Sequence, residues 1–200
     1  MSSTRTTRSI RIGSLTIGGD APIMVQSMAA TRTQDVPATR RQLELLTAAG
    51  ADLVRIAVDS PADVAALAEV VDGATVPLSI DLQENYRLAA EVAPFVQKLR
   101  YNPGHLHHHE KDRSIRDKVA WIADTAKAHD CALRVGCNAG SLAPDYKERF
   151  GKDHVAALVA QAVDHCVILD ELGFHDFCVS IKDSDPRLVV EANERLDRKS

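Results

Sequence analysis

The sequence lacks the patterns that identify several common classes of protein. No apolar run approaches the ~18 residues of a membrane-spanning helix. There is no Gly-x-x-x-x-Gly-Lys-Ser/Thr phosphate loop, no Gly-x-Ser-x-Gly nucleophile turn and no His-Glu-x-x-His zinc motif. The sequence therefore gives no basis for a membrane anchor, a P-loop nucleotide site, a hydrolase of that serine type or a zinc protease of that type.

Cysteine and excess charge are also scarce. The chain has four cysteines, none of them in a Cys-x-x-Cys pair, so we expect reduced thiols in a cytoplasmic protein. A net charge of −4 gives no reason to expect a nucleic acid or a membrane surface as a partner. Apolar residues make up 45% of the chain and charged residues 26%, which is ordinary for a globular domain.

The N-terminal residues, Met1 to Arg8, are basic but lack the apolar centre of a secretion signal. A frayed terminus is favoured, with a piece of a plastid-type organelle transit peptide as the alternative. We therefore expect residues 1–9 to be disordered. Residues 10–200 fit a single domain of the usual ~100–200 residues.

Beyond residue 9, strand-like and helix-like segments alternate. Glycines within an alternating apolar and polar pattern predict a hairpin over residues 10–19. We expect strands at residues 22–28, 52–58, 77–82, 96–102, 132–137 and 176–182. We expect helices over residues 35–50, from residue 60 onward, and over 86–93, 113–129, 155–169 and 185–196. Strict alternation predicts a parallel sheet with right-handed crossovers.

Such a sheet is either open and doubly wound or part of a TIM-type (β/α) barrel. Polar residues lie at or near the C-terminal ends of the predicted strands: Ser27, Arg55, Asp81, Arg100, Asn102, Arg134, Asn138 and Lys182. This favours the barrel, because an open sheet concentrates its site at one switch point. A barrel of eight strands takes about 250 residues. Six units therefore predict an incomplete barrel with two unpaired sheet edges. The chain is then a fragment, a natural truncation or a part that pairs with another chain.

The stretch from Arg134 to Leu142 is the centre of the predicted site. Arg134, Gly136 and Asn138 share one strand face, because strand side chains alternate. A glycine allows a ligand to approach the main chain, and a guanidinium suits phosphate oxygens. The alternative is a solvated arginine on an edge strand beside an ordinary turn.

Cations from four different strands are expected at the same rim: Arg55, Arg100, Arg134 and Lys182. A buried cation without a partner is costly, so four of them in one cavity indicate an anionic ligand such as a diphosphate. Asp81 would orient a substrate hydroxyl or act as a weak base, or else form a supporting ion pair with Arg55 or Arg100. Asn102 and Asn138 would bind hydroxyls or phosphate oxygens, or else cap turns.

A histidine cluster follows Pro103-Gly104, at positions 105, 107, 108 and 109. Neighbouring positions rarely point to one centre, and no carboxylate or cysteine lies at ligand spacing. We expect a solvated loop here and no metal site. The cysteines form no ligand set either.

Taken together, six ordered motifs resemble the 4-hydroxy-3-methylbut-2-enyl diphosphate synthase family of the non-mevalonate isoprenoid pathway. They are Met24-Val25-Gln26-Ser27-Met28, Gly50 to Arg55, Asp81 with Tyr86-Arg87-Leu88-Ala89, Arg100-Tyr101-Asn102-Pro103-Gly104, Arg134 to Leu142, and Ser180 to Asp185. The resemblance runs from about Ile10 to Leu196.

The resemblance implies a TIM barrel followed by a small domain that holds a [4Fe-4S] cluster. It implies reductive opening of 2-C-methyl-D-erythritol 2,4-cyclodiphosphate with electrons from ferredoxin or flavodoxin, and a homodimer. Arg55, Arg100, Arg134 and Lys182 would hold the cyclic diphosphate, with Asn102, Asn138 and Asp81 in the same pocket.

The sequence departs from the family's usual pattern at several positions. Gln83 stands where the family usually has a pocket histidine, Tyr101 and His105 alter the usual Arg-Ile-Asn-Pro-Gly-Asn, and Ala30-Thr31 replaces the usual Asn-Thr. The four cysteines do not match the cluster ligands, which are absent from this chain. We therefore expect the chain alone to be inactive in the two-electron reduction.

Three hypotheses follow. In the first, the chain is the N-terminal barrel of such a synthase and becomes enzymatic only when completed. In the second, it is a non-catalytic remnant or an anion-binding module. In the third, it is a pteroate-synthase-like transferase, whose barrel it resembles in outline but for which the sequence has no motif.

Overall fold

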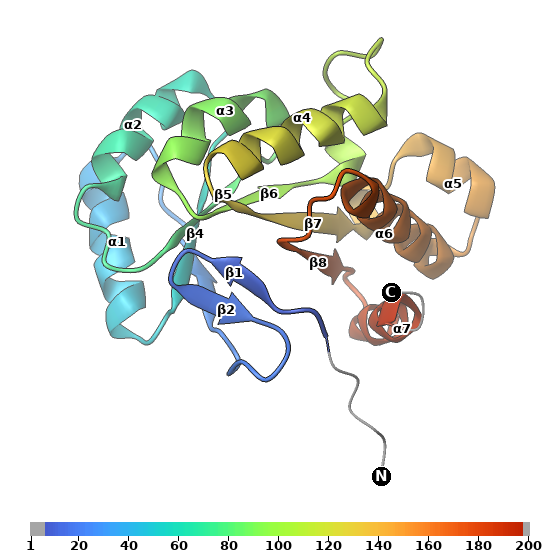
Figure 1. Cartoon of the computed structure of the whole chain (residues 1–200), viewed down its shortest axis with the longest axis horizontal. Coiled ribbons are helices and arrows are strands. Elements are labelled where there is room, and N and C mark those ends of the chain that lie inside the picture. The colour runs from blue at the N-terminus through green and yellow to red at the C-terminus, as the bar shows by residue number, and fades with distance from the viewer. Residues whose placement is uncertain (1–6, 198–200) are drawn as a thin grey trace.

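The computed structural model describes residues 7–197, which contain two β-sheets (Figure 1). Strands β1 (Ile10–Ile12) and β2 (Leu15–Ile17) form an antiparallel hairpin. The second sheet consists of β3 (Gln26–Met28), β4 (Leu53–Ala57), β5 (Leu78–Asp81), β6 (Lys98–Tyr101), β7 (Ala132–Asn138) and β8 (Phe177–Lys182). All its pairings are parallel.

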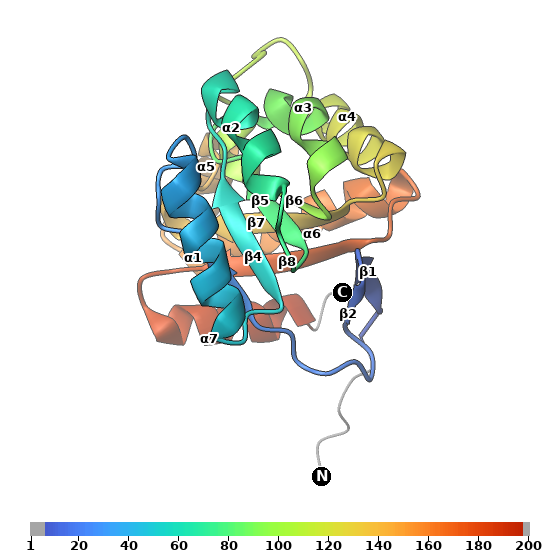
Figure 2. The same ribbon diagram turned by 90° about the vertical axis from the view of Figure 1, so that its left-hand side faces the viewer.

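The large sheet is a curled half-barrel. Each strand pairs with the next one along the chain, so the order is β3-β4-β5-β6-β7-β8, without the reversal of a doubly wound sheet. Helices lie around the outside of the curl (Figure 2). The predicted incomplete (β/α) barrel with an N-terminal hairpin is confirmed, and the open doubly wound sheet is excluded.

The longer helices begin directly after capping residues. They are α1 (Val36–Ala48), α2 (Pro61–Val71), α4 (Ile115–Ala128) and α6 (His154–Glu171). Asp35, Ser60, Ser114 and Asp153 each accept a hydrogen bond from a backbone N–H of the first turn. The last helix, α7 (Pro186–Asp197), follows β8.

Three segments differ from the prediction. The strand expected over 22–28 is limited to β3, because Val25 instead bonds Asp52, with its N–H donating to the Asp52 carboxylate at 2.8 Å. The helix expected over 86–93 is broken into a 3₁₀ turn (Tyr86–Leu88), the single α-turn α3 (Ala89–Val92) and a second 3₁₀ turn (Ala93–Phe95). Helix α5 (Pro144–Phe150) was not predicted, although Pro144 at its first position is a start signal.

The two faces of the curled sheet differ in chemistry. The outer face carries apolar residues such as Ile80, Leu99 and Val135, which join the core beneath the helices. The inner face carries Lys98 and Arg100 on β6, two residues apart, as strand alternation requires. The sheet is therefore polar on its inner face and apolar on its outer face, which the helices cover.

The hairpin lies beneath the half-barrel, at the N-terminal ends of its strands. Ile10 and Ile12 are buried against Leu53 of β4 and Ala132 of β7. The Arg11 N–H donates to Asp176, just before β8, at 3.3 Å. The hairpin therefore covers the N-terminal end of the half-barrel.

The sheet ends at β3 on one side and β8 on the other, and within residues 7–197 neither outer edge has a partner strand. Ile23, just before β3, is 95% exposed. Residues 1–6 of the predicted disordered N-terminus lie outside the described residues, and residues 7–9 belong to no helix or strand. Across residues 7–197 no helix combines the length and the apolar character that crossing a membrane requires.

Candidate functional site

A hollow of about 390 Å³ lies on the inner face of the large sheet, at the C-terminal ends of its strands. Parallel strands bring their carboxyl ends to one rim, where a barrel carries its site. Its lining comprises Met28, Arg55, Asp81, Gln83, Glu84, Arg100, His105, Arg134, Asn138, Ser180, Ile181 and Lys182. Six of the seven predicted site residues are thus brought together, and Asn102 is not among them.

Asp81 is held between two arginines at the floor of the hollow. Its Oδ1 accepts from Nη1 of Arg100 at 2.8 Å, and its Oδ2 lies 3.7 Å from Nε of Arg55. The Asp81 and Arg100 side chains are only 7% and 9% exposed. In this geometry the carboxylate orients the two guanidinium groups, which matches the supporting ion pair that the sequence left open.

Gly136 makes room for Arg100. A Cβ at position 136 would lie 2.1 Å from Nε of Arg100, so a larger residue would displace the guanidinium. Arg100 also donates from Nη2 to the Gly136 carbonyl at 2.9 Å. With its amide oxygen facing this guanidinium, Asn138 accepts from Nη2 at 3.2 Å. The sequence predicted that a ligand approaches the main chain at Gly136, whereas in the structure Arg100 occupies that space.

Within residues 7–197, Arg134 and Lys182 carry positive charge and form no ion pair. Arg134 donates from Nε to the Ser180 hydroxyl at 2.8 Å and has no ion pair. Burial lowers the pKa of Arg134, and the neighbouring Arg55 and Arg100 lower it further. Lys182 is exposed at the end of β8. These two cations are therefore available to an anion, while Arg55 and Arg100 are already oriented by Asp81.

Asn102 is buried and serves the loops. Its Oδ1 accepts from the Gly104 N–H at 3.1 Å, which caps the 3₁₀ turn Pro103–His105, and its Nδ2 donates to the Ser141 hydroxyl at 2.8 Å. A Cβ on Gly104 would lie 1.5 Å from the Ser141 carbonyl oxygen. Asn102 thus locks the loop after β6 onto the loop after β7, and the alternative role of capping describes its position.

Lys98, which the sequence analysis missed, lies in the barrel interior below Arg100 and is 2% exposed. Its ammonium donates to the Gln26 side-chain oxygen, and it has no ion pair within the described residues. Burial, together with the nearby Arg134 and Arg55, lowers the pKa of Lys98 to about 8, while Cys178 acts in the opposite direction. Lys98 adds positive charge beneath the hollow. The period-two spacing from Arg100 was the signal that could have found it.

The cysteines do not fit an iron–sulfur cluster. Cys131, just before β7, and Cys137, near the end of β7, are both buried, and burial raises the pKa of each thiol to about 12. Burial also raises the pKa of Cys166 to about 11. A cluster ligand must be a thiolate. Within residues 7–197 no three His, Cys, Asp or Glu side chains are grouped so that they could hold a metal ion.

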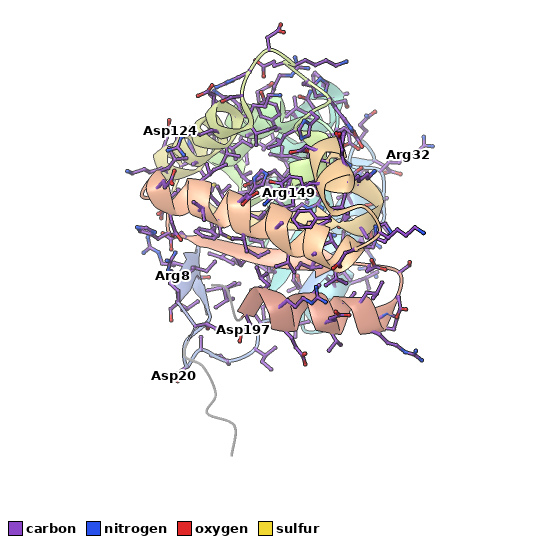
Figure 3. All side chains as sticks on the ribbon, turned by 90° about the vertical axis from the view of Figure 1, so that its right-hand side faces the viewer. Arg8, Asp20, Arg32, Asp124, Arg149 and Asp197 are labelled. Atoms are coloured by element: carbon purple, nitrogen blue, oxygen red, sulfur yellow. The ribbon has the colours of Figure 1, made fainter. Side chains whose placement is uncertain are left out.

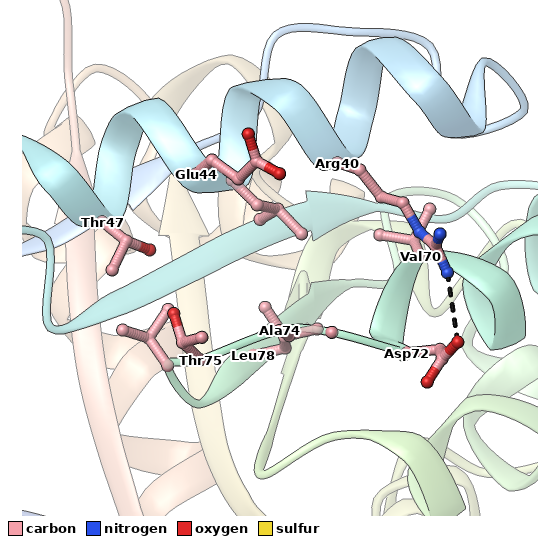
Figure 4. Close-up of a pocket in the computed structure, with 11 residues that line it drawn as sticks. Arg40, Glu44, Thr47, Val70, Asp72, Ala74, Thr75 and Leu78 are labelled. Atoms are coloured by element: carbon pink, nitrogen blue, oxygen red, sulfur yellow. Dashed lines mark hydrogen bonds and ion pairs between the residues drawn. The ribbon is translucent and has the colours of Figure 1, made fainter.

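A second hollow, of about 230 Å³, lies between α1 and the connection from α2 to β5 (Figure 4). Arg40 of α1 forms an ion pair across it with Asp72 at 3.5 Å, and Arg40 also donates to the Glu69 carbonyl at 3.0 Å. Elsewhere, charged side chains such as Arg32, Asp124 and Arg149 extend from the outer surface (Figure 3). The second hollow holds a paired surface arginine and no convergence of cations.

A family model described as the GcpE TIM-barrel domain matches residues 7–200. The 4-hydroxy-3-methylbut-2-en-1-yl diphosphate synthase (flavodoxin) of Rhodopirellula baltica is 51% identical over 188 residues, which cover 94% of this chain and 49% of that protein. The protein of the same name from Haemophilus influenzae is 41% identical over 193 residues, which cover 96% of this chain and 54% of that protein. The chain spans about half the length of the curated relatives it matches.

Solved structures of low sequence identity share the fold. Xanthomonas albilineans dihydropteroate synthase has a TM-score of 0.58 at 16% identity, covering 95% of this chain and 72% of that one. Thermus thermophilus dihydropteroate synthase has a TM-score of 0.50 at 16% identity, covering 96% and 72%. This likeness concerns the barrel architecture alone and does not favour the pteroate-synthase-like hypothesis.

Proposed function

The chain belongs to the GcpE TIM-barrel family, and on that premise we propose that it forms the substrate-binding barrel of a 4-hydroxy-3-methylbut-2-en-1-yl diphosphate synthase. The substrate is 2-C-methyl-D-erythritol 2,4-cyclodiphosphate, whose anionic diphosphate binds in the hollow at the strand ends. The observation that carries the proposal is the surplus of cations there: Arg55, Arg100, Arg134 and Lys182 face two carboxylates, Asp81 and Glu84.

The cations divide the work of binding. Arg134 and Lys182, which have no carboxylate partner in the described structure, bind the phosphate oxygens directly. Arg55 and Arg100 present their remaining N–H groups from orientations that Asp81 and the Gly136 carbonyl fix in advance. Such preorganisation lowers the entropy lost on binding. Lys98 strengthens the positive potential from below.

Asp81 contributes through position and charge. Because both of its oxygens face guanidinium groups, it is better suited to orient Arg55, Arg100 and a substrate hydroxyl than to accept a proton. Asn138 adds an amide at the rim. Asn102 acts indirectly, through the loop that it locks.

Electron transfer is assigned to no residue of this chain. The relatives' names specify flavodoxin, and we propose flavodoxin as the electron donor of the complete enzyme, with ferredoxin as the alternative that the resemblance allows. A [4Fe-4S] cluster would relay the electrons, and the cysteines described above do not fit it. A homodimer and a cytoplasmic location complete the proposal.

Calorimetric titration with the cyclic diphosphate and with inorganic pyrophosphate tests the proposal. Arg134→Ala removes a charge-assisted contact, so it weakens binding by more than about 1.5 kcal/mol, or more than about tenfold. Arg116→Ala, on the exposed face of α4, is the matched control and leaves binding unchanged.

Two results would contradict the proposal. The first is an absence of diphosphate binding by the unaltered chain. The second is binding by Arg134→Ala that differs from the unaltered chain by no more than a few tenths of a kcal/mol, which removes Arg134 from the site. Displacement of the diphosphate by a pterin would favour the pteroate-synthase-like alternative, and binding without turnover after completion of the barrel would favour the non-catalytic module.

A further inference from the structure

His105 lies where the main hollow meets a neighbouring one. A hollow of about 380 Å³ adjoins the site, lined by His105, Asn138, Ala139, Gly140, Ser141, Lys182, Asp183 and Ser184. Three of these residues, His105, Asn138 and Lys182, line both hollows. An anion bound at the rim between Arg134 and Lys182 therefore lies within reach of the His105 ring.

The backbone at His105 is held from two sides. On one side, Gly104 packs against the Ser141 carbonyl, and Asn102 bonds both Gly104 and Ser141. On the other side, the buried Lys118 of α4 donates to the carbonyls of Leu106 and His109, each at 2.7 Å. Hydrogen bonds thus hold the loop on both sides of His105, so its side chain faces the hollows from a fixed backbone position.

One ring nitrogen of His105 is already committed. Nδ1 bonds the Gln83 backbone carbonyl, which can only accept, so Nδ1 carries a hydrogen. Within residues 7–197 no hydrogen bond engages Nε2. In the neutral ring Nε2 is then a bare acceptor that repels a phosphate oxygen, and after a second protonation it becomes a donor.

The charged groups around the ring come from β4, β5, β6, β7 and β8 and from the loops that follow β5, β6 and β8. After β5, the Glu84 carboxylate lies 3.4 Å from Nδ1. In the loop after β6, which carries His105 itself, the His108 ring stacks on the His105 ring with centroids 5.0 Å apart. His108 also bonds the Glu84 carboxylate. Lys182 and Asp183 face His105 from the end of β8. The other charged groups across the hollow are Arg55, Asp81, Arg100 and Arg134.

Glu84 can compensate one imidazolium, but His105 and His108 share it. A bound diphosphate supplies negative charge on the Nε2 side, where no protein carboxylate bonds the ring. Binding an anion therefore favours a proton on His105.

We propose that His105 is a phosphate-binding residue of this site that engages the ligand in its protonated form, so that diphosphate binding takes up one proton from solvent. The inference rests on the proposed function, because it assigns the residue and the proton that accompany the same ligand. Lys182 and His105, which both line the two adjoining hollows, then contact the same anion.

The test is calorimetric titration of the whole chain with inorganic pyrophosphate at pH ~6 and ~8, each in two buffers of different ionisation enthalpy, which reports the protons taken up. His105→Gln keeps a polar side chain but cannot be protonated. His105→Asn is the second variant, in case the longer amide disturbs the loop. His107→Gln changes the same residue type in the same loop, at a position that lines neither hollow.

We expect His105→Gln to bind pyrophosphate about tenfold more weakly at pH ~6, with a smaller loss at pH ~8, and to take up fewer protons than the unaltered chain. His107→Gln should match the unaltered chain in both measurements. Because the ligand's own protonation is common to all the proteins, it cancels in these differences.

The outcomes separate the inference from the proposed function. Binding and proton uptake that stay the same in both His105 variants overturn the role of His105 and leave the diphosphate site intact. A chain that binds no pyrophosphate at either pH, before any substitution, overturns the proposed function and the inference with it. An equal loss in His107→Gln would also overturn the inference, because the effect would belong to the loop as a whole.

Discussion

Two of the hollows described above hold arginines in opposite circumstances. Between α1 and the α2–β5 connection, Arg40 meets Asp72 with side chains that are 42% and 90% exposed. At the strand ends, Arg100 meets Asp81 with side chains that are 9% and 7% exposed. In the first pair, both side chains are in contact with solvent. The second is desolvated and shares its carboxylate with another arginine.

The difference shows which part of the molecule depends on its charges. An exposed ion pair contributes ~0–1 kcal/mol, because water and salt screen it. A desolvated pair contributes little when intact but is costly to break, since the remaining charge stays buried. Charge substitutions should therefore have large effects at the strand ends and small effects at the helical hollow.

The largest effect is expected for Arg100→Met, which leaves Asp81 buried with only the more distant Arg55 as a partner. We expect it to lower the free energy of unfolding by about 3 kcal/mol, the lower end of the range for a broken buried pair. Urea unfolding followed by circular dichroism measures it. The double variant Asp81→Leu with Arg100→Met removes both charges and should recover most of the loss. A single variant as stable as the unaltered protein would contradict the comparison.

An effect of at most the same size, but of opposite sign, is expected for Lys98→Met. The pKa of Lys98 is lowered to about 8, against about 10.4 for an exposed lysine. The unfolded state therefore holds the proton more tightly, and the unaltered protein gains stability as the pH rises through this window. At pH 7 Lys98→Met should be more stable by up to about 3 kcal/mol, since each pKa unit corresponds to ~1.4 kcal/mol.

This advantage should shrink above pH 8 and vanish near pH 10.5. Urea unfolding at several pH values measures the trend, and Lys127→Met, at an exposed position in the last turn of α4, should leave the pH dependence unchanged. A Lys98→Met protein that is less stable at pH 7 would mean that the ammonium is well compensated in the interior.

The smallest effect is expected for Arg40→Ala in the helical hollow. Losing an exposed ion pair should change the free energy of unfolding by less than about 1 kcal/mol and leave pyrophosphate binding unaltered. The same urea and calorimetric measurements apply. A loss comparable to that of Arg100→Met would erase the distinction between the two hollows.

The sequence was sufficient for the half-barrel and for the convergence at its rim. Strict strand–helix alternation requires parallel strands, and parallel strands bring their carboxyl ends together. Arg55, Asp81, Arg100 and Arg134 could therefore be placed in one hollow without knowledge of any contact. Their positions at or near the ends of the predicted strands were enough to place them at this rim.

The sequence was not sufficient where a role depends on a partner distant in the chain. From the sequence, Asn102 is expected to line the rim. In the structure its amide instead donates to the hydroxyl of Ser141, 39 positions away. From the sequence, Gly136 is expected to leave space for a ligand. In the structure the Arg100 side chain occupies that space. His105 was passed over because a loop has no periodicity from which the direction of a side chain can be inferred. Lys98 was missed because attention to strand ends overlooks the layer beneath them.

The N-terminal hairpin has a consequence for the order in which the protein assembles. Each strand of the large sheet pairs with its neighbour in sequence, so the sheet can grow as the chain leaves the ribosome. The hairpin is different, because Arg11 meets Asp130 and Asp176, which lie 119 and 165 residues further on. The hairpin is therefore synthesised well before these partners, and Ile10 and Ile12 lack the part of their packing that Ala132 supplies until β7 has been made.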